Sequence, residues 1–286
     1  MSRADEIGEM TPAQLVRRAA DYLDRHGVDS PRITAELLLA SVLEVDRSTL
    51  ATRTEGPTPQ QAKAFGRALC LRCGGMPTQH VTGVEGFRRL MLIVRPGVFI
   101  PRPETELLVE LVLDPIHDLP APVVVDVGTG TGAIALAVAD ERRDARVFAI
   151  DDSGAAVALT RKNATALGLS IEVLLGDLLA PLPASLRGGV DAVVSNPPYV
   201  RPDEVASLPA EVLADPETAL VGGIELVERL CAEAMAWLRP GGMLALEIGE
   251  TQGDEVSRVV SVAGLTDARV VADLTGRDRF VVARRP

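Results

Sequence analysis

From residue 123 onwards the chain alternates short apolar runs with segments of helical periodicity, and this alternation restricts its fold more than any other feature. Five of the runs contain few charges: residues 123–127, 146–150, 171–175, 191–195 and 243–248. Uninterrupted apolar runs are typical of strands that are buried on both faces. Helical segments lie between them, notably residues 134–140 and 155–167. The pattern therefore predicts right-handed βαβ units and a parallel sheet.

The C-terminal part of the chain departs from this alternation. Residues 268–273 and 279–283 form two further runs, and the connection between them is too short to hold a helix. These two strands must therefore be antiparallel. We expect an α/β fold with a doubly wound, mostly parallel seven-stranded sheet and an antiparallel final strand. This arrangement resembles the fold of S-adenosylmethionine-dependent methyltransferases.

The N-terminal part of the chain contains three signals for the start of a helix. Thr11-Pro12, Ser30-Pro31 and Thr58-Pro59 each place a capping residue before a proline at the first helical position. Apolar residues recur at helical spacing behind each pair, as they do on the buried face of a helix. This pattern predicts a small helical bundle over residues 1–82, without a chemical motif of its own.

A change of pattern over residues 83–101 predicts a linker between two domains. Residues 90–94 and 98–100 are apolar and flank Arg95-Pro96-Gly97, which is a turn signal, so we expect a β-hairpin here. Prolines on either side of Arg102 end this segment, and a helix with acids in its first turn follows over residues 104–113. The domain that contains the predicted sheet would then occupy residues 102–286.

The formal net charge of −11 is unevenly distributed along the chain. The first 80 residues hold ten acids and ten bases, so the remaining 30 acids and 19 bases carry the whole excess. An acidic surface repels phosphates, which makes the second part a poor match for a nucleic-acid backbone. It is better suited to a small molecule or a basic protein partner.

The cysteines and the apolar runs favour a cytoplasmic protein. Three cysteines make no disulfide framework, and we expect Cys70 and Cys73 to be reduced thiols on one helix because a second pair of zinc ligands is missing. Residues 1–10 are acidic and lack the apolar core of a signal peptide. No apolar run approaches the length that a membrane span requires.

A glycine-rich loop follows the first apolar run and opens a helix. Its backbone can turn tightly and let a ligand approach, and it consists of Gly128, Thr129, Gly130, Thr131 and Gly132. The next run ends in Asp151, at about the spacing expected for an acid that binds ribose hydroxyls. Asp177-Leu178 closes the third run, where Asp177 and the Leu178 backbone can bind an adenine ring. Dinucleotides and S-adenosylmethionine both contain these groups, so the loop alone does not decide the cofactor.

Asn196-Pro197-Pro198-Tyr199 directly follows the fourth run, at the sheet edge where ligands bind in such folds. The prolines fix the backbone and lack N–H groups, and Asn196 adds a side-chain acceptor. An NH₂ group held by the Asn196 oxygen and the Pro197 carbonyl directs its lone pair toward a methyl donor, while Tyr199 packs against the planar group. An amide or base amine is a poor nucleophile, and orientation with electrostatics lowers its barrier. The motif predicts methyl transfer to such a nitrogen, with Asn196, Pro197 and Tyr199 as the catalytic residues.

With these motifs the chain resembles the release-factor glutamine methyltransferases, the HemK/PrmC family of protein N5-glutamine methyltransferases, from about residue 15 to the end. Nucleic-acid amino-methyltransferases share the Asn196–Tyr199 motif, whereas residues 101–106, Pro-Arg-Pro-Glu-Thr-Glu, point to this family. The further matching stretches are residues 126–136, Asp151 with 163–164, 216–220 with 222–223, 247–249 with 252–253, and 273–274 with 276–279.

The resemblance implies that the N-terminal helices help to dock a peptide chain release factor, whose Gly-Gly-Gln glutamine is the substrate. It implies that the cofactor contacts the glycine-rich loop and four further residues, Asp151, Asp177, Leu178 and Asn196. The glutamine would bind to Asn196, Pro197, Pro198 and Tyr199, with Arg102, Glu104 and Thr105 near the same site. Two departures from the family pattern are Gly86-Phe87 in place of Glu-Phe, and Leu178 where an aromatic residue often lies against the adenine.

Three other functions remain to be weighed. Methylation of an exocyclic amino group in RNA or DNA uses the same motif, but the net charge disfavours it. A dinucleotide-dependent oxidoreductase accounts for the glycine-rich loop but not for Asn196–Tyr199 or the final antiparallel strand. A non-enzymatic cofactor-binding adaptor has no need of the intact motif. No metal is expected, because His26, His80 and His117 lack the spacing of metal ligands.

Overall fold

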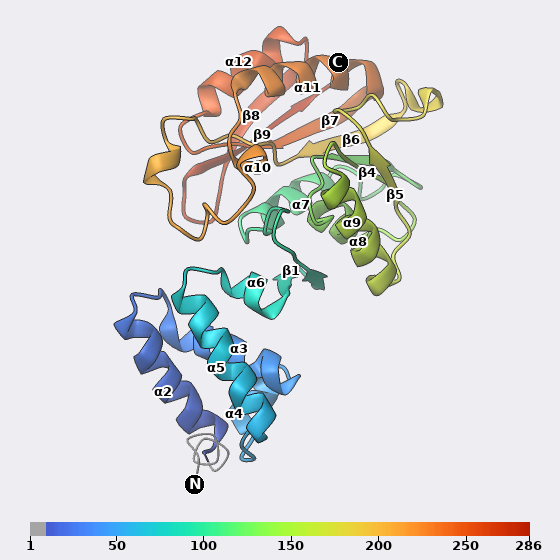
Figure 1. The fold of residues 1–286 in the computed structure, drawn as a ribbon. Helices are drawn as coiled ribbons and strands as arrows, with labels where there is room; N and C mark the ends of the chain where they lie inside the picture. The colour runs from blue at the N-terminus through green and yellow to red at the C-terminus, as the bar shows by residue number, and fades with distance from the viewer. Residues whose placement is uncertain (1–9) are drawn as a thin grey trace. The chain divides into compact units, whose positions relative to one another are not determined.

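A seven-stranded sheet in the order β5-β4-β3-β6-β7-β9-β8 forms the centre of the larger of two units (Figure 1). The computed structural model describes residues 10–286. The larger unit comprises Glu85–Pro209 and Asp215–Pro286, and the smaller unit runs to Val84 and includes Ala210–Ala214. The conclusion that residues 1–10 form no signal peptide lies almost wholly outside the described residues.

The seven predicted strands are all present. They are β3 (Val123–Val127), β4 (Arg146–Asp151), β5 (Glu172–Leu175), β6 (Val190–Ser195), β7 (Leu238–Glu247), β8 (Thr266–Ala272) and β9 (Asp278–Arg284). The first five pair in parallel, and β9 is antiparallel to both β7 and β8. The predicted fold class, including the antiparallel final strand, is confirmed.

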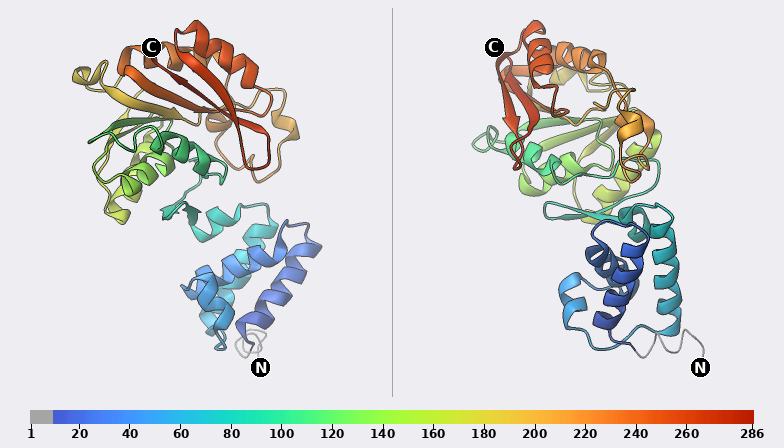
Figure 2. Two further views of the ribbon diagram at one scale, coloured as in Figure 1. Left: turned by 180° about the vertical axis from the view of Figure 1, so that it is seen from behind. Right: turned by 90° about the vertical axis from the view of Figure 1, so that its left-hand side faces the viewer.

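Helices cover both faces of this sheet (Figure 2). The helices of the larger unit are α7 (Thr105–Leu113), α8 (Ala133–Glu141), α9 (Gly154–Leu167), α10 (Glu217–Leu220), α11 (Ile224–Trp237) and α12 (Gly253–Val262), with 3-10 turns at Ala184–Leu186 and Val205–Ser207. Apolar side chains of α7 and α8 form one core with the sheet, and those of α11 and α12 form the other. Neighbouring residues of one strand serve the two cores, as Val124 and Val125 do, which explains why the runs are apolar without interruption.

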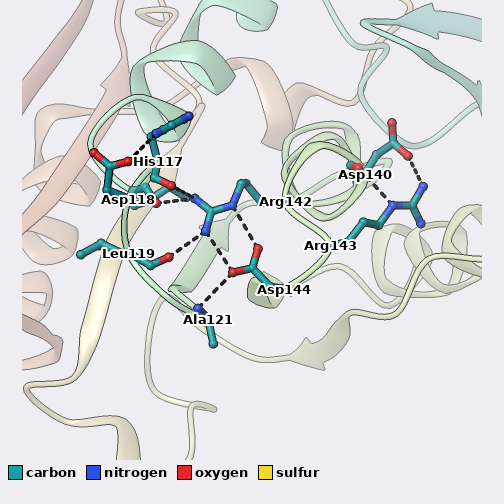
Figure 3. Close-up of polar contacts among 9 residues, drawn as sticks. His117, Asp118, Leu119, Ala121, Asp140, Arg142, Arg143 and Asp144 are labelled. Carbon is teal, nitrogen blue, oxygen red and sulfur yellow. Dashed lines mark hydrogen bonds and ion pairs between the residues drawn. The ribbon is translucent and has the colours of Figure 1, made fainter.

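Arg142, directly after α8, fixes the connection between α7 and β3 (Figure 3). Its guanidinium donates to three backbone carbonyls, those of Ile116, His117 and Leu119. It also pairs with Asp144, whose carboxylate accepts the Ala121 N–H at 3.1 Å. This connection contains three prolines, which have no backbone N–H to donate. The arginine satisfies its carbonyls and so helps to hold α7, which begins at Thr105.

The hairpin is present, but the predicted turn is wrong. Its strands are β1 (Val84–Phe87) and β2 (Leu90–Ile93), joined at Arg88-Arg89. Residues 98–100 are not a strand. They belong to a loop, in which the apolar side chains of Val98 and Ile100 are buried. Arg88 stabilises the turn it occupies: its N–H donates to Glu106 Oε1 at 2.8 Å, and its guanidinium pairs with Glu141.

The smaller unit is a helical bundle. Its helices are α2 (Pro12–Arg25), α3 (Pro31–Leu43), α4 (Arg47–Thr52), α5 (Pro59–Cys73) and α6 (Thr78–Thr82). Thr11 and Thr58 are N-caps as predicted, and each also forms a capping box, whereas Ser30 adopts a left-handed φ of 46° and makes no capping hydrogen bond. Cys70 and Cys73 are free thiols on α5.

Candidate functional site

The strand order brings most of the candidate residues into one row at the carboxyl edge of the sheet. Across the sheet the row runs through Asp177, Asp151, the glycine-rich loop, Asn196 and Glu247, which follow or end β5, β4, β3, β6 and β7. Val127 pairs with Ser195, so the loop and Asn196 leave neighbouring strands about 4.8 Å apart. The order of the strands reverses between β3 and β6, and α/β sheets bind ligands at such a switch point.

Three glycines shape the loop between β3 and α8. Gly128, Gly130 and Gly132 adopt left-handed φ values of 73°, 57° and 86°. A Cβ on Gly128 would meet no heavy atom within 4 Å, so open space lies beside this part of the loop. A Cβ on Gly132 would lie 2.9 Å from Thr160 Cγ2, so this glycine permits close packing against α9. The loop therefore exposes backbone at one end and is tightly packed at the other.

Side chains of α9 hold the loop from behind. Thr160 Oγ1 donates to the Gly130 carbonyl and Asn163 Nδ2 donates to the Thr131 carbonyl, both at 2.9 Å. The same Asn163 amide binds the backbone N–H and carbonyl of Ile93 in β2. One buried amide thus joins the hairpin, α9 and the loop, which restricts the positions that the loop can adopt.

Asp126 stabilises the start of the loop. It is fully buried near the end of β3, and its Oδ2 accepts from Thr129 Oγ1 at 2.6 Å and from the Ala135 N–H at 3.1 Å. Burial raises the pKa of Asp126 to about 7, against the effect of these two donors. Thr129 therefore has a structural role, because its side chain is buried and its hydroxyl donates to Asp126 of β3.

Asp151 connects the end of β4 with the same loop. Its Oδ2 accepts the Gly130 N–H and its Oδ1 accepts the Ser153 N–H, both at 2.9 Å. Burial raises the pKa of this carboxyl, and the two N–H donors oppose the shift. An ionised carboxylate has about four acceptor positions, so it can bind ribose hydroxyls in addition. The open backbone at Gly128 and this acceptor fit a nucleoside-containing cofactor.

The Asp177-Leu178 segment follows β5, at the edge of the sheet where the sequence predicts an adenine site. Asp177 is exposed and pairs with Arg229 of α11. Leu178 has a left-handed φ of 46°, and its buried side chain belongs to the apolar core beneath β5 and α11. Its side chain therefore packs inward, and only its backbone can serve the ligand.

Asn196 is oriented by a residue from α7. Its Nδ2 donates to Thr105 Oγ1 at 3.3 Å. With the NH₂ group engaged, the side-chain oxygen is the part of the amide left to accept a hydrogen bond. The strand end before it is fixed, because Ser195 Oγ donates to the Val127 carbonyl at 2.7 Å. Asn196 and Thr105 are thus brought together, in line with the position near the site that the family resemblance implies for Thr105.

Glu247 lies at the centre of this group of side chains. It ends β7 and is 2% exposed. Its Oε2 accepts from Thr105 Oγ1 at 2.7 Å and its Oε1 accepts from Tyr199 Oη at 3.4 Å. Burial raises the pKa of Glu247 to about 7, opposed by Thr105 and Arg279, and burial raises the pKa of Tyr199 to about 12. Tyr199 therefore keeps its proton at neutral pH and acts as a donor.

The Asn196–Tyr199 corner is supported from outside by two short segments. A Cβ on Gly222 would lie 2.1 Å from the Pro198 carbonyl oxygen, so these two backbones are in direct contact. Val200 hydrogen-bonds through its backbone to the same segment. Gln252 Nε2 donates to the Tyr199 carbonyl at 3.0 Å. These contacts turn a flexible strand end into a fixed corner.

Arg102 and Glu104 do not join this hydrogen-bonded group. Arg102 pairs with the buried Asp215, whose Oδ1 accepts the Ile100 N–H at 3.0 Å, and its guanidinium lies 4.9 Å from the centre of the Phe99 ring. Glu104 is exposed at the start of α7 and raises the pKa of Glu247 through its charge.

Some residues that shape the site had no role assigned from the sequence. Glu247 carried a usable signal, since it is an acid at the end of an apolar run, as Asp151 is. Gly222 and Gln252 lie in stretches that match the family, but their contacts with the corner, like those of Asp215 with Arg102 and Ile100, join segments distant in the chain and only folding reveals them. Among residues 10–286, no group of three or more His, Cys, Asp and Glu residues is placed to hold a metal ion. No helix in that range is long and apolar enough to cross a membrane.

Two family profiles match the chain. The Methyltransferase small domain matches residues 90–258, which is more than half of the chain, and the PrmC N-terminal domain matches residues 14–83.

Curated relatives match over almost the whole length. The release factor glutamine methyltransferase of Mycolicibacterium smegmatis is 44% identical over 277 residues, covering 94% of this chain and 96% of its own. That of Moorella thermoacetica is 40% identical over 284 residues, covering 96% of this chain and 99% of its own.

Solved structures of other methyltransferases share the fold. The hMettl16 catalytic domain, in complex with a MAT2A 3′UTR hairpin, aligns with a TM-score of 0.58 at 18% identity, covering 79% of this chain and 80% of that one. A 16S rRNA methyltransferase of T. thermophilus, in complex with AdoMet and guanosine, aligns with a TM-score of 0.52 at 22% identity, covering 71% and 50%. Similarity at these identities concerns the fold alone.

Proposed function

Because the chain belongs to the release factor glutamine methyltransferase family, we propose that it methylates the side-chain amide nitrogen, N5, of the glutamine in the Gly-Gly-Gln motif of peptide chain release factors. One observation carries the chemical part of this proposal. Thr105 engages the NH₂ end of the Asn196 amide, which leaves the Asn196 oxygen as an acceptor beside the glycine-rich loop.

The corner after β6 binds and orients the glutamine amide. Its two N–H groups donate to Asn196 Oδ1 and to the Pro197 carbonyl, so its lone pair is directed along the sheet edge toward the loop. Pro197 and Pro198 keep these acceptors in place because their ring geometry fixes φ. Tyr199, anchored through its hydroxyl, packs against the planar amide. Orientation of this kind accounts for a large part of the barrier reduction in bimolecular transfers.

The cofactor residues lie on the other side of Asn196. When bound, S-adenosylmethionine supplies an electrophilic methyl carbon. The backbone of Gly128–Gly132, the carboxylate of Asp151 and the Asp177-Leu178 backbone are assigned to its binding, with Asn196 between it and the glutamine. No strong base is required, because the nitrogen loses a proton readily to water once it has formed its new bond. No metal takes part in this scheme.

The proposal divides the chain by task. Residues 1–82 are assigned to docking of the release factor, residues 83–101 to a linker, and residues 102–286 to catalysis. Arg102, Glu104 and Thr105 are assigned to the substrate side of the site; Arg102 acts there through its pairing with Asp215. Release factors act in the cytoplasm, which is therefore the compartment that the proposal implies.

A competition between substrates tests the proposal. The protein is incubated with methyl-labelled cofactor and either a purified release factor or bulk RNA. We expect label on the release factor and none on RNA, and we expect Asn196→Ala to abolish transfer with the fold intact. Label on RNA alone would replace the proposal by methylation of an exocyclic base amine, which the same corner also accommodates.

A further inference from the structure

Glu247 is assigned no role of its own in the scheme above, although it is a buried carboxylate in contact with the corner. It is 2% exposed and contacts two side chains of the substrate site, Thr105 and Tyr199. A buried carboxylate is expensive to maintain unless its partners compensate. Its position at the end of β7, next to Asn196 in the row, suggests that its charge serves the reaction.

The hydrogen-bond directions around Glu247 are determined by its charge. An ionised carboxylate only accepts, so the hydroxyls of Thr105 and Tyr199 must both donate to it. Thr105 has then used its only hydrogen, and its oxygen can only accept from Asn196. The Asn196 amide must therefore present its NH₂ group to Thr105, which agrees with its Nδ2 lying 3.3 Å from Thr105 Oγ1.

We propose that Glu247 is a positioning residue that acts through Thr105 to set which end of the Asn196 side-chain amide faces the substrate. The inference rests on the proposed function, because it concerns the acceptor that holds the glutamine. With Glu247 ionised, Asn196 offers an oxygen to the glutamine NH₂ group. With Glu247 protonated, Thr105 is free to donate to the Asn196 oxygen, and the amide can turn its NH₂ group toward the glutamine, where two donors oppose each other.

Several groups act on the ionisation of Glu247. Arg279 of β9 favours the charged form, as do the hydroxyls of Thr105 and Tyr199, whereas burial and the charge of Glu104 at the start of α7 favour the neutral form. The balance raises the pKa of Glu247 to about 7. Its charge therefore changes within the range in which the enzyme can be assayed.

The test compares pH profiles of kcat/KM for methyl transfer to one release factor. For the wild type we expect the rate to fall about tenfold per pH unit below an apparent pKa near 7. In Glu247→Gln this acid limb should disappear, because the isosteric amide does not titrate. Glu141→Gln removes an enclosed carboxylate that pairs with Arg88, away from the corner, and should keep the limb.

A second pair of variants covers the case in which Glu247→Gln does not fold. Thr105→Val removes the hydroxyl that links Glu247 to Asn196 and should lose the acid limb, whereas Thr105→Ser keeps a hydroxyl and should restore it. If the role of Glu247 were purely structural, its replacement by Gln would lower the rate by the same factor at every pH. An acid limb that persists in Glu247→Gln or Thr105→Val would overturn the inference while leaving the proposed function standing. Absence of transfer by the wild type at every pH would overturn both.

Discussion

Replacing Gly222 by alanine should displace the Asn196–Tyr199 corner and slow methyl transfer about 100-fold. A Cβ at this position would lie 2.1 Å from the Pro198 carbonyl oxygen and 2.8 Å from the Pro198 carbonyl carbon. Ordinary carbon–oxygen contacts begin at about 3.2 Å, so the two backbones must separate by roughly 1 Å. A misplacement of about 1 Å at a reacting group can reduce the rate by roughly 10²-fold.

The neighbouring glycine provides a matched control. A Cβ on Gly223 would also come within 2.1 Å of an oxygen, but that oxygen is Glu225 Oε2, at the free end of a flexible side chain. Gly223→Ala should therefore retain the wild-type rate. The assay measures transfer of labelled methyl groups to a release factor, alongside cofactor affinity by calorimetry, which should be unchanged in Gly223→Ala. Equal rates for Gly222→Ala and Gly223→Ala would refute the argument that this contact positions the corner.

Three further predictions concern the loop, the cofactor and the buried acid. Asp151→Ala should weaken cofactor binding by about 10- to 100-fold in calorimetry, since it removes a charged acceptor, whereas the exposed neighbour Asp152→Ala should not change it; equal affinities would reject the ribose role. Gly132→Ala should lower the free energy of unfolding by about 3 kcal/mol in urea titrations, because Gly132 has a left-handed φ and a Cβ there would lie 2.9 Å from Thr160. The control, Gly154→Ala, should not destabilise the fold, because its Cβ would meet nothing within 4 Å. The pKa of Glu247 is raised from 4.5 to about 7, so between these pH values the native state holds a proton that the unfolded state has released. The free energy of unfolding therefore falls as pH rises from 4.5 to 7. Glu247→Gln should therefore be more stable than the wild type by about 3 kcal/mol at pH 8 and similar to it at pH 4.5; a difference independent of pH would contradict the raised pKa.

The sequence predicts the sheet well because its signals are local. Each of the seven strands contains an apolar run, and the short connection after β8 requires an antiparallel partner for it. The hairpin turn was misplaced because Arg95-Pro96-Gly97 does form a turn, but the strands pair around Arg88-Arg89, a turn without glycine or proline. That turn depends on Glu106 and Glu141, which are distant in the chain.

In the candidate site, too, local motifs could be predicted from the sequence, whereas contacts between distant segments could not. Motifs at strand ends identified the glycine-rich loop, Asp151 and Asn196, because parallel strands end at one edge. Contacts between separate segments, such as Gly222 with Pro198, have no local pattern and could not be predicted. The environment of Leu178 also depends on the tertiary fold, since its left-handed φ turns an apolar side chain into the core.

A crystal structure with S-adenosylhomocysteine and a peptide containing Gly-Gly-Gln tests the central claim most directly. The account predicts that the glutamine side-chain nitrogen lies within about 3.2 Å of both Asn196 Oδ1 and the Pro197 carbonyl oxygen, on the side facing the cofactor sulfur. A glutamine amide bound elsewhere, or a cofactor separated from Asn196 by other side chains, would contradict it.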